Sequence, residues 1–550
     1  MSQMLKSSGA MGIATLASRV LGMVREILYA HFMGAGPVAA AFTMAFMIPN
    51  LFRRLLGEGA LTAAFIPIFK EKEVTAGEVE MWRSANAVIS GLMIAAAVII
   101  GIVMLGISII LAFEAPAIAA SADSLRSSGL ILGTVNPGVV ELGWLSAETR
   151  LMLQLLRVMF PYMLLVCLAA IFMGMLNARG HFFVPAMGTT VLNLILIATV
   201  LWLAPRFGKE LETQIFGLAI GVLVAGVGQA IYLLPTMRRE GFRYQWVSPW
   251  HDETVQLVVR KMVPGMMGVA AFQFNVLLTQ GIAWTVNPQI VASFGYAVRL
   301  MELPQGVFGI SLATFLLPTL SGLAAGKKYP EFRATLGQAL GYLALGNLAA
   351  SVLLTVLSEP IVRLLFERGE FDAADTRRSS FALACLAPGL VAFSMVNILA
   401  RAFYALGDTK TPMKISVVCL GINVILSFWL IGSFAEGGLG IANTLSAACN
   451  VWLLFHALRR KLKHLGLSAL RQNILSMAGG AIVAGEAAWL LSGAWERSIG
   501  HSGFIQKLGA VFIPLGVASL VYGAILLWLK VPQAQDFLGL LRRKGFRLGK

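Results

Sequence analysis

Long apolar segments recur along almost the whole chain, separated by short polar stretches. A helix needs about 20 mostly apolar residues to cross the hydrocarbon core of a bilayer. By that measure the pattern predicts fourteen transmembrane helices, over residues 9–33, 37–69, 85–113, 148–177, 184–205, 214–237, 257–286, 289–322, 333–357, 379–406, 411–434, 437–458, 472–495 and 506–530.

The second of these segments, 37–69, is too long for one straight span. Pro49-Asn50 and Gly57-Glu58-Gly59 interrupt it, so we expect a bent helix that faces a cavity. The longest stretch without clear periodicity is 114–147, which is rich in Ala, Ser and Gly and which we expect to be irregular or to lie on the membrane surface.

Composition supports a membrane protein. Of the residues, 58% are hydrophobic and 13% are charged, and the mean hydropathy is +0.79. Soluble domains carry about 25% charged residues, so a soluble enzyme is excluded. The long unbroken apolar runs also exclude an outer-membrane barrel, whose strands alternate. The chain is therefore predicted to be an all-α polytopic membrane protein.

The formal net charge of +16 has a topological explanation. Positive residues gather in the cytoplasmic loops of membrane proteins, and clusters such as Arg238-Arg239, Lys327-Lys328 and Arg459-Arg460-Lys461 fall on one predicted side. The loop 358–378, which holds four arginines among five acids, departs from this bias. We predict cytoplasmic N- and C-termini in a multi-pass inner-membrane protein and no nucleic-acid partner.

The two halves of the chain carry the same pattern of helix-breaking residues. Gly180 and Pro185 recur with the same spacing as Gly407 and Pro412, and LTAAFIP at 61–67 resembles LATFLLP at 312–318. Chance is the alternative, but the consistent order favours duplication. Two parallel six-helix halves around a central cavity form a transporter architecture. We predict an N-terminal lobe (1–240), a C-terminal lobe (241–465), two additional helices (466–530) and a basic cytoplasmic tail (531–550).

Arginines inside apolar segments are the candidate functional residues, because a charge in a membrane span is costly. Arg19, Arg25, Arg53 and Arg299 are predicted to bind substrate, because guanidinium groups bind phosphate or diphosphate bidentately. The alternative is that each arginine extends to the membrane interface or pairs with an acid. Four further residues are expected to support the cavity: Asn50, Arg54, Glu58 and Glu302.

Sequence motifs for other chemistry are absent. There is no Walker A sequence, no GxSxG elbow and no His/Cys spacing typical of zinc, so we expect no cofactor, no metal and no enzyme activity.

Three sequence blocks resemble a known family. They are SRVLGMVREILYAHFMGAG (18–36), AFMIPNLFRRLLGEGALTAAFIPIF (45–69) and YAVRLMELPQGVFGISLATFLLPTLS (296–321). Together they closely resemble the bacterial MurJ/MviN lipid II flippases of the MOP exporter superfamily. The chain differs from many of these proteins at Ala40 and Val298, where relatives often have an Asp, and at Met47, where they often have a Lys.

The resemblance implies a transporter that moves undecaprenyl-diphosphate-linked peptidoglycan precursor, lipid II, from the cytoplasmic to the outer leaflet. It also implies that Arg19, Arg25, Arg53 and Arg299 line the central cavity, that Glu58 is a family acid, and that the last two helices take the lipid tail. Membrane lipids are expected partners. Contacts with cell-wall synthases stay open, as does coupling to an ion gradient or to the membrane potential. The alternative functions are a flippase for another polyprenyl-diphosphate-linked oligosaccharide and a non-transporting cell-wall assembly scaffold.

Overall fold

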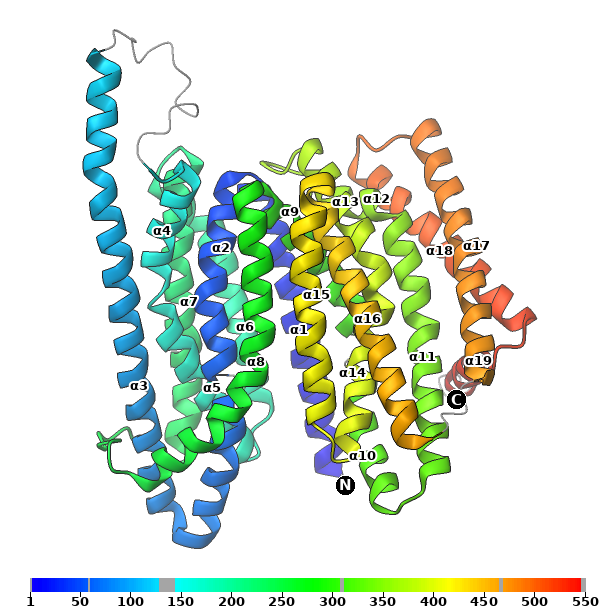
Figure 1. The fold of residues 1–550 in the computed structure, drawn as a ribbon, viewed down its shortest axis with the longest axis horizontal. Coiled ribbons are helices and arrows are strands. Elements are labelled where there is room, and N and C mark those ends of the chain that lie inside the picture. Colours follow the sequence, from blue (N-terminus) through cyan, green and yellow to red (C-terminus); the bar gives the residue numbers. More distant parts are fainter. Residues whose placement is uncertain (1, 58–59, 128–143, 307–310, 464–467, 546–550) are drawn as a thin grey trace. The chain divides into compact units, whose positions relative to one another are not determined.

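The computed structural model describes residues 2–57, 60–127, 144–306, 311–463 and 468–545, and every regular element in them is helical (Figure 1). The all-helical prediction is therefore confirmed for the described residues. The chain divides into two compact units, Met1–Leu277 and Leu278–Lys550.

The first unit is a bundle of long apolar helices. α1 packs against α6, α5 and α6 pack against α7, and α2 packs against α4. α3 lies at the edge of the unit (Figure 1), and only 11% of the most apolar window of Ala64–Glu114 is buried inside the protein, as expected of a lipid-facing span. The elements are α1 (Ser2–Met33), α2 (Pro37–Phe52), η1 (Arg53–Gly57), α3 (Ala60–Ser127), α4 (Ala147–Met159), α5 (Tyr162–Ala178), α6 (Phe183–Ala198), η2 (Thr199–Leu203), η3 (Ala204–Phe207), α7 (Leu211–Arg239) and most of α8 (Glu253–Val286).

The second unit is built around a core to which α11, α14, α16, α17 and α18 contribute. Phe332, Leu340 and Leu399 are fully buried in it, and so are Leu454 and Leu526. The elements are α9 (Pro288–Pro304), α10 (Ser311–Ala325), α11 (Tyr329–Val356), α12 (Ser358–Phe366), α13 (Ala373–Leu386), η5 (Ala387–Gly389), α14 (Leu390–Ala405), α15 (Lys410–Phe434), α16 (Glu436–Leu462), α17 (Ser468–Ser498), α18 (Phe504–Trp528) and α19 (Pro532–Gly545).

Prolines set the breaks inside several spans, because proline lacks the N–H that continues a helical ladder. α2 contains Pro49 and passes into the π-helical turn η1 at Arg53, which confirms the predicted interruption of segment 37–69. α4 and α5 meet at Pro161 with a bend of 45°.

The turns at Gly180 and Gly407 have the same backbone geometry. Both glycines have positive φ angles, 88° and 75°. The residue after each glycine donates its N–H to the carbonyl five residues earlier, at 2.9 Å for His181 and 3.0 Å for Asp408. This is the hydrogen bond of a glycine helix end, and its recurrence at matching positions supports the predicted duplication.

The expected irregular segment 114–147 is partly helical instead. α3 continues to Ser127, which corrects the prediction for 114–127, and residues 128–143 lie outside the described part of the chain. The reason is local composition: residues 115–127 include five alanines and no glycine, and alanine is the strongest helix former.

The number of spans is supported in part. Within the described residues, nine helices are long and apolar enough to cross a membrane, or ten if the bent pair α4–α5 forms one span. Fourteen spans therefore stays a prediction.

Candidate functional site

Arg25 lies in the last third of α1, and three neighbouring side chains contact it. Its Nη1 donates to Oδ1 of Asn193 on α6 at 2.9 Å, and its Nη2 lies 2.5 Å from Oε1 of Glu26. The guanidinium carbon lies 5.6 Å from the ring centroid of Tyr29, within reach of a cation–π interaction. Only 15% of the Arg25 side chain and 14% of the Glu26 side chain are exposed. The charge is thus fixed in position inside an otherwise apolar bundle.

A seam of polar side chains between α1 and α6 supports this position. The Ser18 and Thr189 hydroxyls are 2.9 Å apart, and Asn193 Nδ2 donates to the Ser18 carbonyl at 3.3 Å. Asn193 therefore orients the Arg25 side chain and also joins α6 to the backbone of α1. Arg19, next to Ser18, is exposed, and within the described residues it forms neither a hydrogen bond nor an ion pair.

Arg53 and Arg54 lie in the π-helical turn that follows α2, and both are half-buried. Arg53 Nε donates to Oδ1 of Asn50 at 2.6 Å, which fixes the arginine against its own helix. Glu58, the other supporting residue predicted in this segment, lies outside the described residues.

In the second unit, Arg299 and Glu302 form an ion pair on α9, with Nη1 2.9 Å from Oε2. The spacing of three residues places both side chains on one helix face. Their side chains are 40% and 46% exposed, so the pair is accessible within the unit.

The structure therefore brings Arg25 together with Glu26, Arg53 with Asn50, and Arg299 with Glu302. Sequence reasoning did not find Asn193, Thr189 or Ser18. The available signal was weak: all three are uncharged polar residues within apolar segments, and such residues commonly form helix–helix hydrogen bonds in membrane proteins.

A second kind of arginine lies at helix ends. Arg179, after α5, contacts Glu240 from Nε and Glu78 from Nη2, each at 2.8 Å, and also pairs with Glu73. His181 Nε2 lies 2.7 Å from the other oxygen of Glu240. The hydrogen bonds from Arg179, followed by those from His181, lower the pKa of Glu240, and the carboxylates raise the pKa of Arg179.

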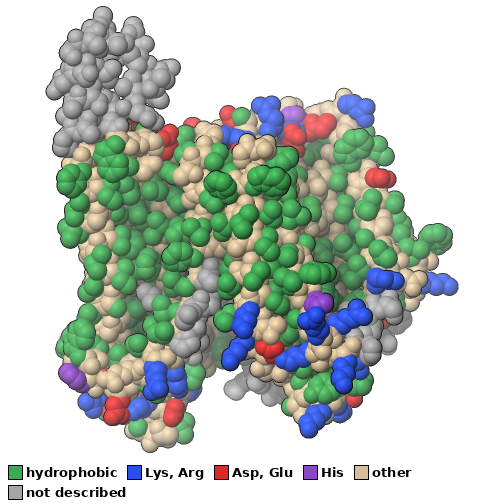
Figure 2. All heavy atoms as spheres, in the orientation of Figure 1, with side chains coloured by type: hydrophobic (Ala, Val, Ile, Leu, Met, Phe, Trp, Pro, Cys, Tyr) green, Lys and Arg blue, Asp and Glu red, His purple; other side chains and the backbone are tan. Residues whose placement is uncertain are grey.

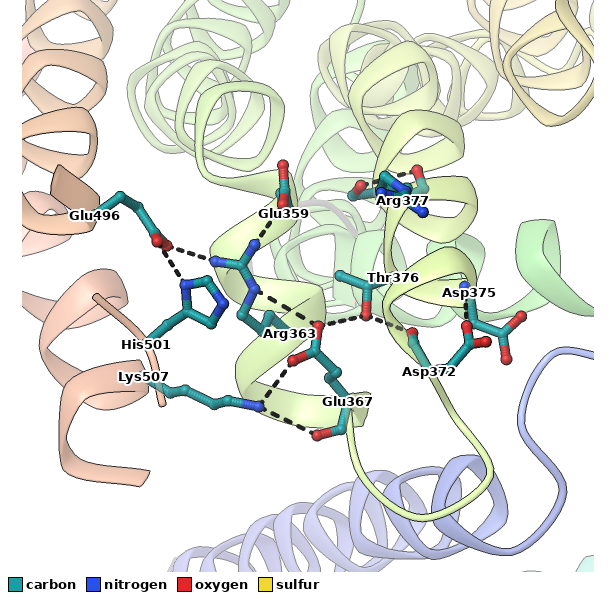
Figure 3. A network of polar contacts seen from close by, with 11 residues as sticks. Glu359, Arg363, Glu367, Asp372, Asp375, Thr376, Arg377, Glu496, His501 and Lys507 are labelled. Carbon is teal, nitrogen blue, oxygen red and sulfur yellow. Dashed lines mark hydrogen bonds and ion pairs between the residues drawn. The ribbon is translucent and has the colours of Figure 1, made fainter. Parts of the chain in front are cut away.

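The corresponding network in the second unit centres on Arg363 of α12 (Figure 3). Arg363 lies between Glu359, Glu367 at 3.6 Å and Glu496 of α17 at 2.5 Å. Glu496 also contacts His501 at 2.6 Å, and Lys507 of α18 lies 3.0 Å from Glu367. Burial opposes ionisation of Glu367, but hydrogen bonds from Lys507 and Thr376 outweigh it and lower its pKa. The network ties α12 to α17 and α18.

Comparison with solved structures defines the fold. The chain is similar to a lipid II flippase MurJ in an inward closed conformation, with a TM-score of 0.73, 20% identity and coverage of 94% of this chain and 99% of that chain. It is also similar to an inward-facing multidrug resistance MATE transporter of the MOP superfamily, with a TM-score of 0.60, 14% identity and coverage of 82% and 98%. The fold is that of the MOP transporters.

Comparison with sequences identifies the family. A family model described as "Lipid II flippase MurJ" matches residues 29–509. Proteins named "Probable lipid II flippase MurJ" are similar along nearly the whole chain: that of Haemophilus influenzae is 32% identical over 94% of this chain and 98% of its own length, and that of Vibrio cholerae is 31% identical over 96% and 97%. The chain belongs to the MurJ family of lipid II flippases, as the sequence resemblance predicted. It is a multi-pass membrane transporter and not an enzyme.

Proposed function

We propose that the protein moves lipid II from the cytoplasmic to the outer leaflet of the bacterial inner membrane by alternating access between two lobes. The family supports lipid II as the substrate. The observation that carries the mechanism is Arg25: a charged side chain, 15% exposed, fixed by Asn193 and Glu26 inside an apolar bundle. Such a residue is costly in a membrane and is typical of a functional site.

In this mechanism Arg19, Arg25 and Arg53 of the first lobe and Arg299 of the second bind the diphosphate and head group. Arginine suits this task because its planar guanidinium binds two phosphate oxygens at once. Asn50, Arg54, Glu58 and Glu302 support the site. The polyprenyl chain stays in the surrounding lipid.

Glu26 and Glu302 have a specific part in the cycle. In the empty transporter their negative charges offset the positive charges of the two arginines. Glu26 lies 2.5 Å from Arg25, and Glu302 lies 2.9 Å from Arg299. The incoming diphosphate replaces these carboxylates as the partner of the two arginines. Binding therefore changes the charge balance of the site, which is what favours one lobe arrangement over the other.

The proposed architecture has fourteen spans with both termini in the cytoplasm. Lobes 1–240 and 241–465 enclose the cavity, and 466–530 adds a groove for the lipid tail, followed by the basic tail 531–550. The packing of α17 on α18 and on α11 supports placement of the extra helices against the second lobe. No cofactor is required. A membrane potential acts on the transported charge with about 2.3 kcal/mol per charge per 100 mV.

Complementation of a bacterium depleted of its own flippase tests the proposal. Wild type is expected to restore growth, whereas Arg19→Ala, Arg25→Ala, Arg53→Ala and Arg299→Ala are expected to fail at matched membrane abundance. Arg206→Ala is the control, because Arg206 is exposed on η3 outside the proposed site.

Two outcomes would contradict the proposal. Full rescue by the Arg19, Arg25, Arg53 and Arg299 variants would favour a scaffold that recruits cell-wall synthases without transport. Failure of abundant wild type, combined with transport of another polyprenyl-diphosphate-linked oligosaccharide, would assign a different substrate to the same site.

A further inference from the structure

Six basic side chains lie at the adjoining ends of two helices in the second unit. α15 begins with Lys410 and continues with Lys414 one turn later. α15 and α16 pack along each other and are joined by Ala435 alone, so the start of α15 and the end of α16 lie at the same end of the pair. Residues spaced by three and four share a helix face, and Lys463 directly follows the end of α16. We call the following set the basic face: Lys410, Lys414, His456, Arg459, Arg460 and Lys463.

The lysines and arginines of the basic face have no carboxylate partner among the described residues. All six side chains are exposed, and in the described part of the chain none of them forms an ion pair or a hydrogen bond. The nearby carboxylate of Asp408 is already occupied, at 2.7 Å from Lys461 and 3.0 Å from the Thr411 N–H. These contacts, with Lys461 first, lower the pKa of Asp408 to about 2.

The basic face adjoins an apolar surface that suits acyl chains. Val417 and Val418, the next exposed positions on α15, are 51% and 56% exposed. Trp452 on α16 is 65% exposed and stacks on His456 with 5.9 Å between ring centroids. Figure 2 shows Lys and Arg side chains gathered at the end of these helices beneath an apolar surface. Tryptophan beside basic residues is typical of the depth of lipid headgroups.

The matching helix in the first unit lacks these charges. The turns at Gly180 and Gly407 have the same geometry, and the positions that match Lys410 and Lys414 are Phe183 and Met187. Phe183 is 48% exposed. The orientation of the helix in the membrane therefore does not by itself require basic residues at the start of α15.

We infer that the basic face binds the headgroup of an anionic phospholipid, with the acyl chains against Val417 and Val418. The leaflet is the one at this end of α15, which the predicted topology makes cytoplasmic. Lysines act on the headgroup phosphate as point charges, while Arg459 and Arg460 can bind it bidentately. The basic face includes none of the arginines proposed to bind lipid II, and the inference does not depend on the proposed transport mechanism.

Native mass spectrometry of the delipidated full-length protein tests this inference, with phosphatidylglycerol and phosphatidylcholine as probes. Wild type is expected to bind phosphatidylglycerol about tenfold more tightly than phosphatidylcholine. The variant Lys410→Gln/Lys414→Gln/Arg459→Gln/Arg460→Gln should lose this preference. The control, Arg238→Gln/Arg239→Gln/Arg260→Gln/Lys261→Gln, removes four exposed charges from the first unit and should keep the preference within about twofold.

A charge-preserving variant, Lys410→Arg/Lys414→Arg, should keep the preference and shows that the loss does not come from misfolding. Equal losses in the glutamine variant and its control would overturn the inference, because any cytoplasmic charge would then suffice. Displacement of phosphatidylglycerol by an equal concentration of glycerol phosphate would also overturn it, because the face would then bind free phosphate and not a lipid.

Discussion

The arginines of this protein occupy two contrasting environments. Arg25 and Arg299 lie within predicted membrane segments, and each pairs with a carboxylate of its own helix, Glu26 and Glu302 respectively; we call these two the span arginines. Arg179 and Arg363, the clamp arginines, lie at helix ends, and each contacts three carboxylates from different turns or helices.

This difference in the carboxylates around each arginine distinguishes arginines that bind substrate from arginines that join helices. Three carboxylates carry more negative charge than the single positive charge of the guanidinium that they surround. Such an arginine therefore does not attract an anionic substrate. A guanidinium that pairs with a neighbouring carboxylate of its own helix can exchange that carboxylate for a diphosphate. Sequence position alone does not reveal this distinction, because both groups are arginines near apolar segments.

The largest expected effect is on transport through Arg25. Arg25→Lys keeps the charge but removes the planar fork that contacts Asn193 and Glu26. We expect lipid II transport in proteoliposomes to fall about tenfold while the apparent Tm stays unchanged. A normal transport rate in Arg25→Lys would show that charge alone is sufficient there.

The clamp arginines should show the reverse pattern. Arg179→Ala leaves Glu73, Glu78 and Glu240 close together without their shared cation. We expect the apparent Tm in detergent to fall by about 5 °C, because removal of one partner of a partly buried ion pair is destabilising. Arg206→Ala should change it by less than about 1 °C. An unchanged Tm in Arg179→Ala would show that this clamp arginine does not stabilise the fold.

A smaller effect should appear at Glu26. Glu26→Gln removes the carboxylate that competes with the diphosphate for Arg25, 2.5 Å away. The variant should bind lipid II about threefold more tightly and release it more slowly. Weaker binding would indicate that Glu26 positions Arg25 and does not compete with the substrate.

The smallest effect concerns pH. Hydrogen bonds from Arg179 and His181 hold the pKa of Glu240 below its ordinary value of 4.5. Its contribution to stability is therefore fully present above the unfolded-state pKa and is lost as the pH falls through the lower folded-state pKa. Between pH 6 and pH 3, Tm should fall by about 2 °C less in Glu240→Gln than in wild type. Identical pH profiles would contradict this linkage.

Much of the helix pattern could be predicted from the sequence because apolar runs and prolines act locally. The interruption near Pro49 and the glycine turns at Gly180 and Gly407 are examples. The helix over 114–127 is not predicted from the sequence because the segment lacks clear periodicity, whereas its alanines favour a helix.

The contacts around the arginines were less predictable. Glu359 and Glu367 flank Arg363 at a spacing of four residues, which the sequence displays. Contacts between Arg25 and Asn193 depend on how two distant helices pack, which residue spacing does not encode. The roles of the span arginines in binding remain proposals for the same reason: their chemistry is visible in the sequence, but the substrate contacts are not.

The affinity of the purified full-length protein for lipid II is the most direct test of the central claim. We would measure it by native mass spectrometry for wild type, Arg25→Ala, Arg299→Ala and the control Arg206→Ala. The account predicts about tenfold weaker binding in the two span-arginine variants and unchanged binding in the control. Equal affinity in all four proteins would contradict the claim that the span arginines bind the diphosphate.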